Sequence, residues 1–242
     1  MKRDLVLKRD VAERLTQMDR LLAATYRTPE SALRNKSDPL DEAIYIILTF
    51  QTDIPRAKET WGRLRNKYRT WSAVEKAPRG ELERVLRPGG LQKQKAASIK
   101  ALLREVRRLN GSLSLDFLHR LSTEEAERIL LRLPGLSWKG ARCVLLYSLR
   151  RHSFPVDVNT FRILKRIGIL RLTAVYRRKS LHDELQNAVR GPRRKSLHIN
   201  LVIHGQRTCL PRSPKCSVCP IRSICGSYSG LPKQRSFSRS AV

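Results

Sequence analysis

The sequence predicts an all-α fold, and three observations support this prediction. Apolar residues recur at helical spacing along most of the 242 residues. Near the N-terminus one helical face is formed by Val11, Leu15, Met18 and Leu22. Signals that start and stop helices separate such segments. No stretch shows the alternation of apolar and polar residues that a substantial sheet would need.

A break and two helices follow the N-terminal helix. Residues 29–39 are polar and bounded by prolines, so we expect a loop or linker there. Residues 40–51 are apolar on most sides, as a central buried helix would be. Asp53 and Pro55 then give a helix start, a candidate cap followed by proline in the first turn, and the helix continues to Tyr68.

Proline and glycine mark the ends of the next helices. A short helix over about 81–87 stops at Pro88, and a longer one over about 93–109 ends at Gly111. Residues 230–242 are basic and rich in serine, so we expect a disordered tail there.

A tight turn at residues 133–137 joins two amphipathic helices. Ser122 and Glu125 open the first of them with the spacing of a capping box. Proline ends that helix, and Gly135 allows a backbone conformation that other residues resist. Unpaired N–H groups at the start of the second helix would suit a DNA phosphate, although such a turn also serves as a plain connection.

The charge balance points to a polyanionic partner. Fifty Lys and Arg residues against 21 Asp and Glu residues give a net charge of +29. Nucleic acid fits because neutralised phosphates release condensed counterions; high solubility is the plainer interpretation. A membrane is not expected, since the longest apolar run, residues 43–48, is far too short to span a bilayer.

The N-terminus and the cysteines indicate a reducing compartment. The first residues contain no secretory hydrophobic segment. We therefore expect an intracellular protein, cytoplasmic or associated with the nucleoid, whose five cysteines are ligands or core residues rather than disulfides. Cys143 falls on the inner face of a predicted helix and is expected in the core.

The other four cysteines form a candidate metal site. The spacing C-x6-C-x2-C-x5-C is formed by Cys209, Cys216, Cys219 and Cys225. Four thiolates in one loop can bind a [4Fe–4S] cluster, and zinc held by four cysteines is the alternative. Zinc ribbons usually pair two C-x2-C knuckles, and only one is present here, so the spacing favours the iron–sulfur cluster.

Three segments resemble the endonuclease III family of DNA glycosylases. Residues 133–141, with the turn and Lys139, resemble the helix–hairpin–helix of that family. Residues 154–162 resemble the segment that carries its essential aspartate, here Asp157, and the cysteine spacing matches its cluster loop. The resemblance covers about residues 38–228. It implies a two-lobed helix–hairpin–helix DNA glycosylase fold with a C-terminal iron–sulfur cluster loop.

The resemblance also implies which residues carry the chemistry. Lys139 would be the nucleophile, and Asp157 would face it across a cleft. A neutral amine can attack the sugar C1′, expel the base and form a Schiff base, which permits β-elimination of the 3′ phosphate. A carboxylate near C1′ would stabilise the positive charge that develops as the glycosidic bond breaks.

Five further residues are candidates for contact with DNA. Two of them resemble the residues that enter the duplex when a nucleotide is extruded, two belong to the hairpin turn, and one lies in the basic cysteine loop. They are Gln51, Leu91, Gly135, Ser137 and Lys215. The plainer alternatives are a helix-terminal contact for Gln51 and a core position for Leu91.

The sequence departs from the family pattern at two places. Ser137 and Trp138 stand where members usually have glycine and a basic residue. Val158 and Asn159 follow the aspartate where the best-known members have threonine and histidine. The second place lies close to the damaged nucleotide, so the base that is removed stays open.

The combined features predict a bifunctional DNA glycosylase and abasic-site lyase of base excision repair, which removes damaged, by default oxidised, pyrimidines from double-stranded DNA. A mismatch uracil or thymine glycosylase, a methylated-cytosine glycosylase and a non-catalytic DNA-binding protein are the alternatives. We expect a monomer with a helical lobe at residues 39–151, a cluster lobe formed by residues 1–38 and 152–229, and the basic tail.

Overall fold

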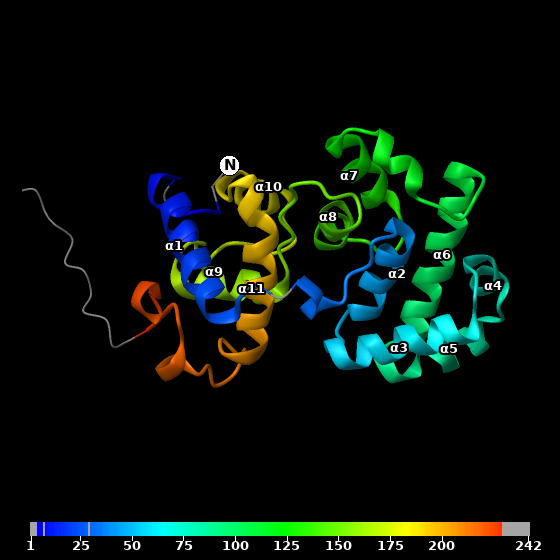
Figure 1. Ribbon diagram of the computed structural model, residues 1–242, viewed down its shortest axis with the longest axis horizontal. Helices are drawn as coiled ribbons and strands as arrows, with labels where there is room; N and C mark the ends of the chain where they lie inside the picture. The colour runs from blue at the N-terminus through cyan, green and yellow to red at the C-terminus, as the bar shows by residue number, and fades with distance from the viewer. Residues whose placement is uncertain (1–3, 7, 29, 229–242) are drawn as a thin grey trace, which may run out of the picture.

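The structure, a computed structural model, describes residues 4–6, 8–28 and 30–228 and consists of helices joined by loops (Figure 1). These residues form no strand, and one isolated antiparallel bridge joins Leu5 and Leu170. The predicted all-α fold is therefore confirmed. The basic tail that we expected at the C-terminus lies outside the described residues.

The α-helices of the described chain are α1 (Lys8–Tyr26), α2 (Pro39–Thr49), α3 (Ile54–Lys67), α4 (Trp71–Lys76), α5 (Arg79–Leu86), α6 (Gln92–Asn110), α7 (Thr123–Arg132), α8 (Trp138–Tyr147), α9 (Val158–Ile167), α10 (Lys179–Ala188) and α11 (Arg194–Arg207). Short 3₁₀ turns lie between them at η1 (Glu30–Leu33), η2 (Arg87–Gly89), η3 (Asp116–Arg120), η4 (Gly191–Arg193), η5 (Cys216–Val218) and η6 (Arg222–Ile224).

Two helices start at the predicted caps. The Asp53 carboxylate accepts a hydrogen bond from the backbone N–H of Arg56 at 2.9 Å, at the start of α3. Ser122 and Glu125 form the complete capping box of α7. Each bond satisfies an N–H group that the helix itself leaves unpaired, so the start signals of both helices are confirmed.

The first hydrophobic core is formed by α2–α8, the right-hand group of helices in Figure 1. Its buried apolar residues lie between Leu40 and Leu149. The helix α2 runs through this core, with Leu40, Ile44 and Leu48 almost fully buried. The prediction of a central buried helix is confirmed, because α2 is covered by helices on most sides.

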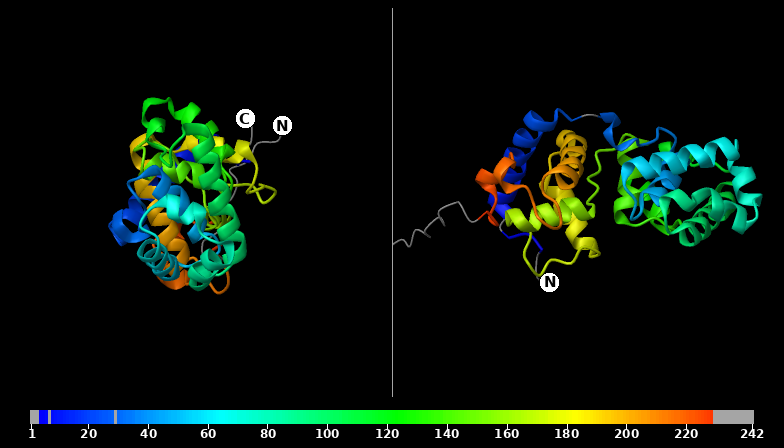
Figure 2. Two further views of the ribbon diagram at one scale, coloured as in Figure 1. Left: turned by 90° about the vertical axis from the view of Figure 1, so that its right-hand side faces the viewer. Right: turned by 90° about the horizontal axis from the view of Figure 1, so that it is seen from below.

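The second core is formed by α1, α9, α10 and α11. Val11 and Leu15, on the predicted apolar face of α1, are buried in it. The view from below in Figure 2 separates this group of helices from the first. The two-lobed fold is thus confirmed. The lobe boundaries that we give, residues 39–151 against residues 1–38 with 152–229, stay a prediction.

A third, small apolar cluster lies where the lobes meet. Leu33 of η1 and Ile199 and Ile203 of α11 form it. Ile54 of α3 and Tyr147 of α8 pack against it from the first lobe. Because α11 therefore has apolar neighbours on the α1 side and on this side, it is buried all round rather than amphipathic.

Arg142 of α8 forms the main polar contact between the lobes and is only 2% exposed. Its Nε donates to Glu127 of α7 at 2.8 Å. Its two terminal nitrogens donate to the carbonyl oxygen of His182 and to the Asp183 carboxylate of α10, each at 2.6 Å. The guanidinium is thus fully paired, which is the condition for burying a charge without a large penalty.

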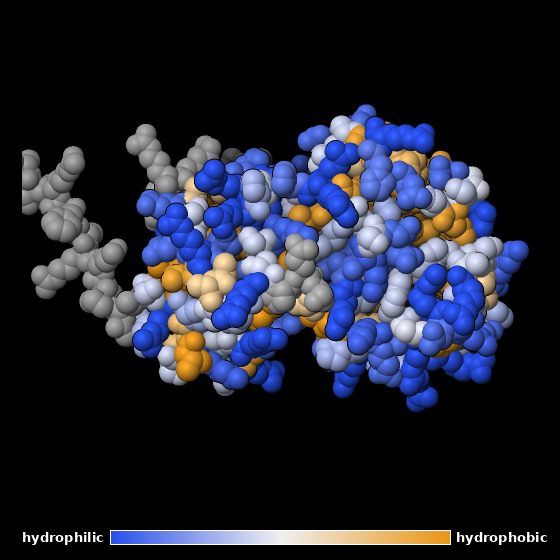
Figure 3. All heavy atoms as spheres, in the orientation of Figure 1, coloured by the Kyte–Doolittle hydropathy of each residue, from blue (hydrophilic) through white to orange (hydrophobic). Residues whose placement is uncertain are grey.

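Hydrophilic residues cover most of the face shown in Figure 3, on both lobes. Among the described residues, no helix combines the length and the apolar character that crossing a membrane requires.

Candidate active site

The predicted turn connects α7 to α8 and depends on Gly135. This residue has φ +85°, in the left-handed region that favours glycine. A Cβ atom on it would lie 3.0 Å from both Ile47 Cδ1 and Ser98 Cβ. The turn therefore packs tightly against α2 and α6, which fixes where α8 begins.

Ser137 is exposed at the N-cap of α8, and its side chain makes no capping hydrogen bond. Trp138 packs towards α10, with its ring centroid 6.4 Å from that of His182. The Lys179 ammonium lies 5.3 Å from the Trp138 ring centroid. A cation from α10 thus lies beside the position where the family usually has a basic residue.

Lys139 lies in the first turn of α8 and is half-buried. Its ammonium group hydrogen-bonds Cys143, one turn further along the helix. Burial lowers the pKa of Lys139, but Cys143, Asp157 and Glu42 together raise it above the ordinary lysine value. Cys143 itself is 1% exposed, and burial raises its pKa to about 12, so it is a core thiol as predicted.

Glu42 of α2 is a fully buried carboxyl beside Lys139. It accepts a hydrogen bond from the side-chain amide of Asn35 and another, 2.6 Å long, from the backbone N–H of Lys36. Burial raises its pKa to about 7, although both hydrogen bonds and the charge of Lys139 oppose the shift. Near neutral pH this site can therefore gain or lose a proton.

Asp157 caps α9, as predicted. Its Oδ1 accepts a hydrogen bond from the backbone N–H of Thr160 at 2.7 Å, and its Oδ2 accepts one from the Asn159 side chain at 2.8 Å. The carboxylate is half-buried at the N-terminus of the helix, where the helix dipole favours a negative charge. Asp157 comes from the second lobe, and its charge acts on Lys139 of the first.

A chain of hydrogen bonds runs from Asp157 to the cysteine loop. Asn159, which bonds Asp157, accepts a bond from Arg162 Nη2 at 2.9 Å. The same nitrogen donates to the carbonyl oxygens of Gly205, at 2.9 Å, and Cys209, at 2.8 Å. Asn159, one of the departures from the family pattern, thus connects the candidate catalytic aspartate to the first cysteine of the loop.

His198 of α11 is a further buried group near the pair. It is 1% exposed, and its Nδ1 is buried without a hydrogen-bond partner. Burial lowers its pKa to about 4, and the charges of Asp157 and Lys139 also act on it. The imidazole is therefore neutral at physiological pH and leaves one buried ring nitrogen unsatisfied close to the candidate catalytic residues.

The four cysteines of the loop after α11 are unpaired thiols: Cys209, Cys216, Cys219 and Cys225. Burial raises the pKa of Cys219, and the charges of the other three raise it further, because the sulfurs lie near one another. Arg166 Nη1 donates to Cys209 Sγ at 3.2 Å. Four such thiols in one loop, with an arginine to offset negative charge, fit an iron–sulfur cluster. In the described part of the chain, no three His, Cys, Asp or Glu side chains are arranged around one metal ion.

All five candidate DNA-binding residues are exposed: Gln51, Leu91, Gly135, Ser137 and Lys215. Gln51 follows the end of α2 and does not belong to the helix, as its φ of 48° shows. Leu91 precedes α6 with φ 51° and is 40% exposed, so it is no core leucine.

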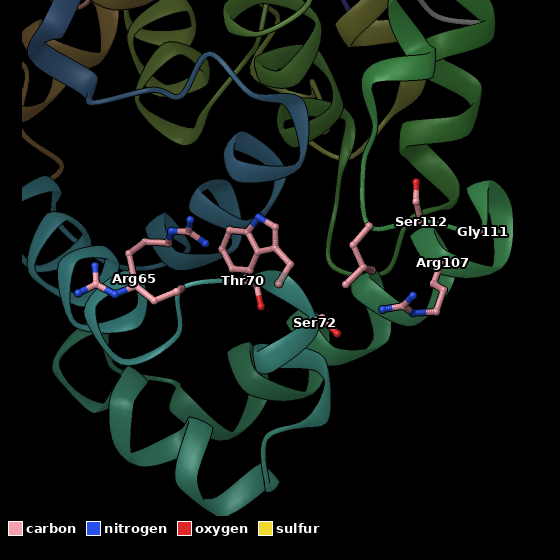
Figure 4. Close-up of a pocket in the computed structure, with 9 residues that line it drawn as sticks. Arg65, Thr70, Ser72, Arg107, Gly111 and Ser112 are labelled. Carbon is pink, nitrogen blue, oxygen red and sulfur yellow. The ribbon is translucent and has the colours of Figure 1, made fainter.

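A separate hollow in the surface lies where α3, α4 and the end of α6 meet (Figure 4). Arg65, Arg69, Trp71 and Arg107 contribute to its wall. The Arg65 guanidinium lies over the Trp71 ring, 4.7 Å from its centroid, and Arg107 pairs with Glu75 at 2.7 Å. None of its lining residues is a predicted site residue, so it is not the candidate active site.

The helices and the turn between α7 and α8 define a protein of the helix–hairpin–helix class. Residues 44–186, more than half of the chain, match the family described as HhH-GPD superfamily base excision DNA repair protein, and the chain belongs to this superfamily of DNA glycosylases. Residues 209–225 match the iron–sulfur binding domain of endonuclease III. The expected family and the expected [4Fe–4S] cofactor are thereby confirmed. The match gives no support to the alternative of a zinc site.

Known proteins resemble this chain over most of its length. A putative DNA glycosylase of Arabidopsis thaliana is 31% identical over 153 residues, which are 61% of this chain and 52% of that protein. The DNA glycosylase/AP lyase ROS1 of the same plant is 27% identical over 175 residues, 66% of this chain and 12% of that protein. The chain thus spans about half the length of the first relative and a small part of the second.

Endonuclease III in a non-covalent complex with DNA shares the fold. The TM-score is 0.76 at 22% identity, and the match covers 93% of this chain and 97% of the other.

Glu42 and His198 are site residues that sequence reasoning missed. The available signal was a polar residue next to apolar ones. Glu42 directly precedes the apolar run of residues 43–48, and His198 lies between two apolar residues of α11. Such residues are seldom fully buried unless they are paired or functional. The pattern did not reveal their partners, because those lie far away in sequence.

Proposed function

We propose that this protein is a DNA glycosylase with abasic-site lyase activity, in which Lys139 is the nucleophile and Asp157 the charged partner. One observation carries the proposal: Lys139 in the first turn of α8 and Asp157 at the N-cap of α9 come from different lobes, yet they lie near enough to interact electrostatically. Both are half-buried, so a substrate atom can reach them. The relative named a DNA glycosylase/AP lyase supports the same pair of activities.

The reaction follows from the chemistry of an amine at the sugar. The neutral Nζ of Lys139 bonds to C1′, and the bond from C1′ to the base breaks, so the base leaves with the electron pair and takes up a proton. The amine then loses a proton and the sugar ring opens, which gives an imine between Lys139 and C1′. Loss of a proton from C2′ expels the 3′ phosphate and cuts the strand.

Lys139 must first lose a proton, because its raised pKa keeps it charged at neutral pH. Three groups act on this proton. The Asp157 carboxylate can accept it, Glu42 has a pKa of about 7, and neutral His198 has a free Nδ1. Asp157 also stabilises the positive charge that builds up at C1′.

The iron–sulfur cluster, held by the four loop cysteines, would supply no bond-making step and would give the loop its shape. The residues of the loop then act on DNA and on the site: exposed Lys215 meets a phosphate, and Cys209 anchors Arg162, which holds Asn159 against Asp157. We propose that the protein acts as a monomer on double-stranded DNA.

The proposed substrates are damaged pyrimidines, with oxidised ones first. The test is a panel of duplexes, each with one altered base: thymine glycol, uracil or thymine opposite guanine, 5-methylcytosine, or an abasic site. Excision and strand cleavage are measured separately. The proposal predicts excision and nicking on at least one of them, and the substrate that is cut identifies the base.

Variants separate the proposal from a non-catalytic DNA-binding protein. Lys139→Gln should bind the same duplexes and cleave none, while Lys67→Gln, which changes an exposed lysine at the end of α3, should remain active. If wild type and Lys139→Gln are equally inert on the whole panel, the DNA-binding protein is the better interpretation.

A further inference from the structure

Lys95 is a buried lysine that the proposed chemistry does not use. It lies on the inner face of α6, and 2% of its surface is exposed. Its ammonium donates to the carbonyl oxygens of Leu48 at 2.9 Å and Gly89 at 2.7 Å and to the hydroxyl of Thr52 at 2.5 Å. One cation therefore binds the end of α2, the loop after it and the loop before α6.

The two loops also contact each other directly above Lys95. The Thr52 hydroxyl lies 2.6 Å from the Gly89 carbonyl oxygen, to which it donates. A Cβ atom on Gly89 would lie 2.9 Å from Thr60 Oγ1 and 3.4 Å from Lys95 Nζ. A side chain at residue 89 would therefore push its loop away from α3 and from Lys95.

Each loop has an exposed tip in a strained conformation. Gln51 and Leu91, neither of them glycine, adopt φ values of 48° and 51°. Phe50, next to Gln51, is 53% exposed, and Leu91 is 40% exposed. Non-glycine residues keep such conformations where the surrounding structure enforces them, and they gather at functional sites.

Among the described residues, the charge on Lys95 has no acidic partner. Burial lowers its pKa to about 8, and no charged neighbour contributes to the shift. Carbonyl and hydroxyl oxygens alone offset the ammonium, so a well-packed apolar side chain could fill the same space without leaving a carboxylate unpaired. The hydrogen bonds of Lys95 serve the geometry of the loops more than the stability of the core.

We infer that Lys95 is a positioning residue that locks the two loops together, so that Gln51 and Leu91 enter the duplex as one rigid unit. The inference rests on the proposed function, because only a nucleotide-extruding protein needs such a unit. Rigid loops cost little to order on binding, and a misplaced insertion element would leave the extruded nucleotide poorly held.

The test compares Lys95→Met with Lys100→Met. Lys100 lies on the same helix and donates to the backbone carbonyls of Glu75 and Ala77, away from both loops. Single-turnover excision from a duplex should fall by about 30-fold or more in Lys95→Met and stay unchanged in Lys100→Met. Borohydride trapping on a single-stranded abasic oligonucleotide, which needs no insertion, should be equal in all three proteins.

A second readout needs no chemistry. The fluorescence of 2-aminopurine next to an abasic-site analogue reports unstacking when the protein binds, and Lys95→Met should lose this signal. Thr52→Val removes the hydroxyl that bonds Lys95 and Gly89 and keeps the shape of the side chain. It should lose part of the fluorescence signal, and it replaces Lys95→Met in the test if that variant does not fold.

The outcomes separate the two proposals. If Lys95→Met matches Lys100→Met in both excision and fluorescence, Lys95 is no positioning residue. If wild type neither excises nor traps, the proposed function fails, and the fluorescence comparison still decides whether Lys95 controls insertion.

Discussion

The carboxyl of Glu42 lies buried beside Lys139, and its protonation sets how much negative charge the site holds. Its folded-state pKa of about 7 is above its ordinary value of 4.5. The protonated form therefore stabilises the fold below pH 4.5, and this contribution is lost as the pH rises through 7. From pH 5 to pH 7 the loss from this one group is about 2 kcal/mol.

Glu42→Gln removes that dependence, since the amide does not titrate. We predict that between pH 5 and pH 7 the free energy of unfolding falls about 2 kcal/mol less in Glu42→Gln than in wild type. Urea unfolding at both pH values measures it, with Glu59→Gln on the exposed face of α3 as the control. If the free energies of unfolding of wild type and Glu42→Gln change equally with pH, the carboxyl of Glu42 is not buried in solution.

Among single residues, the sequence predicts those whose roles depend on neighbours in the sequence. Lys139 and Asp157 lie in short motifs, and Asp157 also carries a capping signal that needs only the next three residues. Glu42, His198 and Lys95 have no such signal, because their burial depends on residues from other helices. A charged residue in an apolar segment indicates that something is unusual, but its partners emerge only when the chain folds.

Among the elements, α9 links the candidate active site to the cysteine loop. Its first residues hold Asp157, and Arg162 and Arg166 on later turns donate to carbonyl oxygens of the loop. Backbone bonds from Gly226 and Ser227 to the end of α9 add to this contact. The position of Asp157 thus depends on a loop more than fifty residues away in sequence.

Arg162→Met breaks the chain between Asn159 and Cys209. We predict that excision falls by about 10- to 100-fold, the cost typical of losing a residue that supports a site from behind. Lys165→Met serves as the control, because Lys165 lies on the same helix and donates to the carbonyl of Leu172, away from the cysteine loop. Equal excision by both variants would mean that the loop does not position Asp157.

The helices that the sequence predicts well are those with caps and one apolar face, such as α3, α7 and the helix capped by Asp157. It gives no local signal for α11, since that helix is buried on most sides and its apolar residues show no one-sided period. The short α4 and α10, which begins without a side-chain cap hydrogen bond, were not predicted at all. The formation of α10 follows from packing, whereas α4 carries a local signal, the side-chain cap of Thr70.

For the whole molecule, the contact between the lobes decides whether Lys139 and Asp157 meet. Arg142 is the buried cation at this contact, and Glu127 and Asp183 pair with it from opposite lobes. Removing it leaves the partly buried Glu127 carboxylate without this partner and leaves Asp183 paired with Lys179 alone. The lobes would then lose their main polar connection as well as stability.

We predict that Arg142→Met lowers the free energy of unfolding by about 2 to 4 kcal/mol. Arg107→Met removes the exposed pair with Glu75 and should cost clearly less, because solvent screens that pair. Urea denaturation of both variants measures the difference. A loss in Arg142→Met no larger than that in Arg107→Met would mean that the lobes do not depend on this arginine.

The central claim is that Lys139 forms the covalent bond to DNA, and mapping the trapped adduct tests it most directly. The protein is incubated with the duplex that it cleaves, reduced with borohydride and digested, and the peptide that carries the sugar is sequenced by mass spectrometry. The account predicts one modified residue, Lys139, and no adduct in Lys139→Gln. An adduct on another lysine or on the N-terminal amine, or an undiminished adduct in Lys139→Gln, would contradict it.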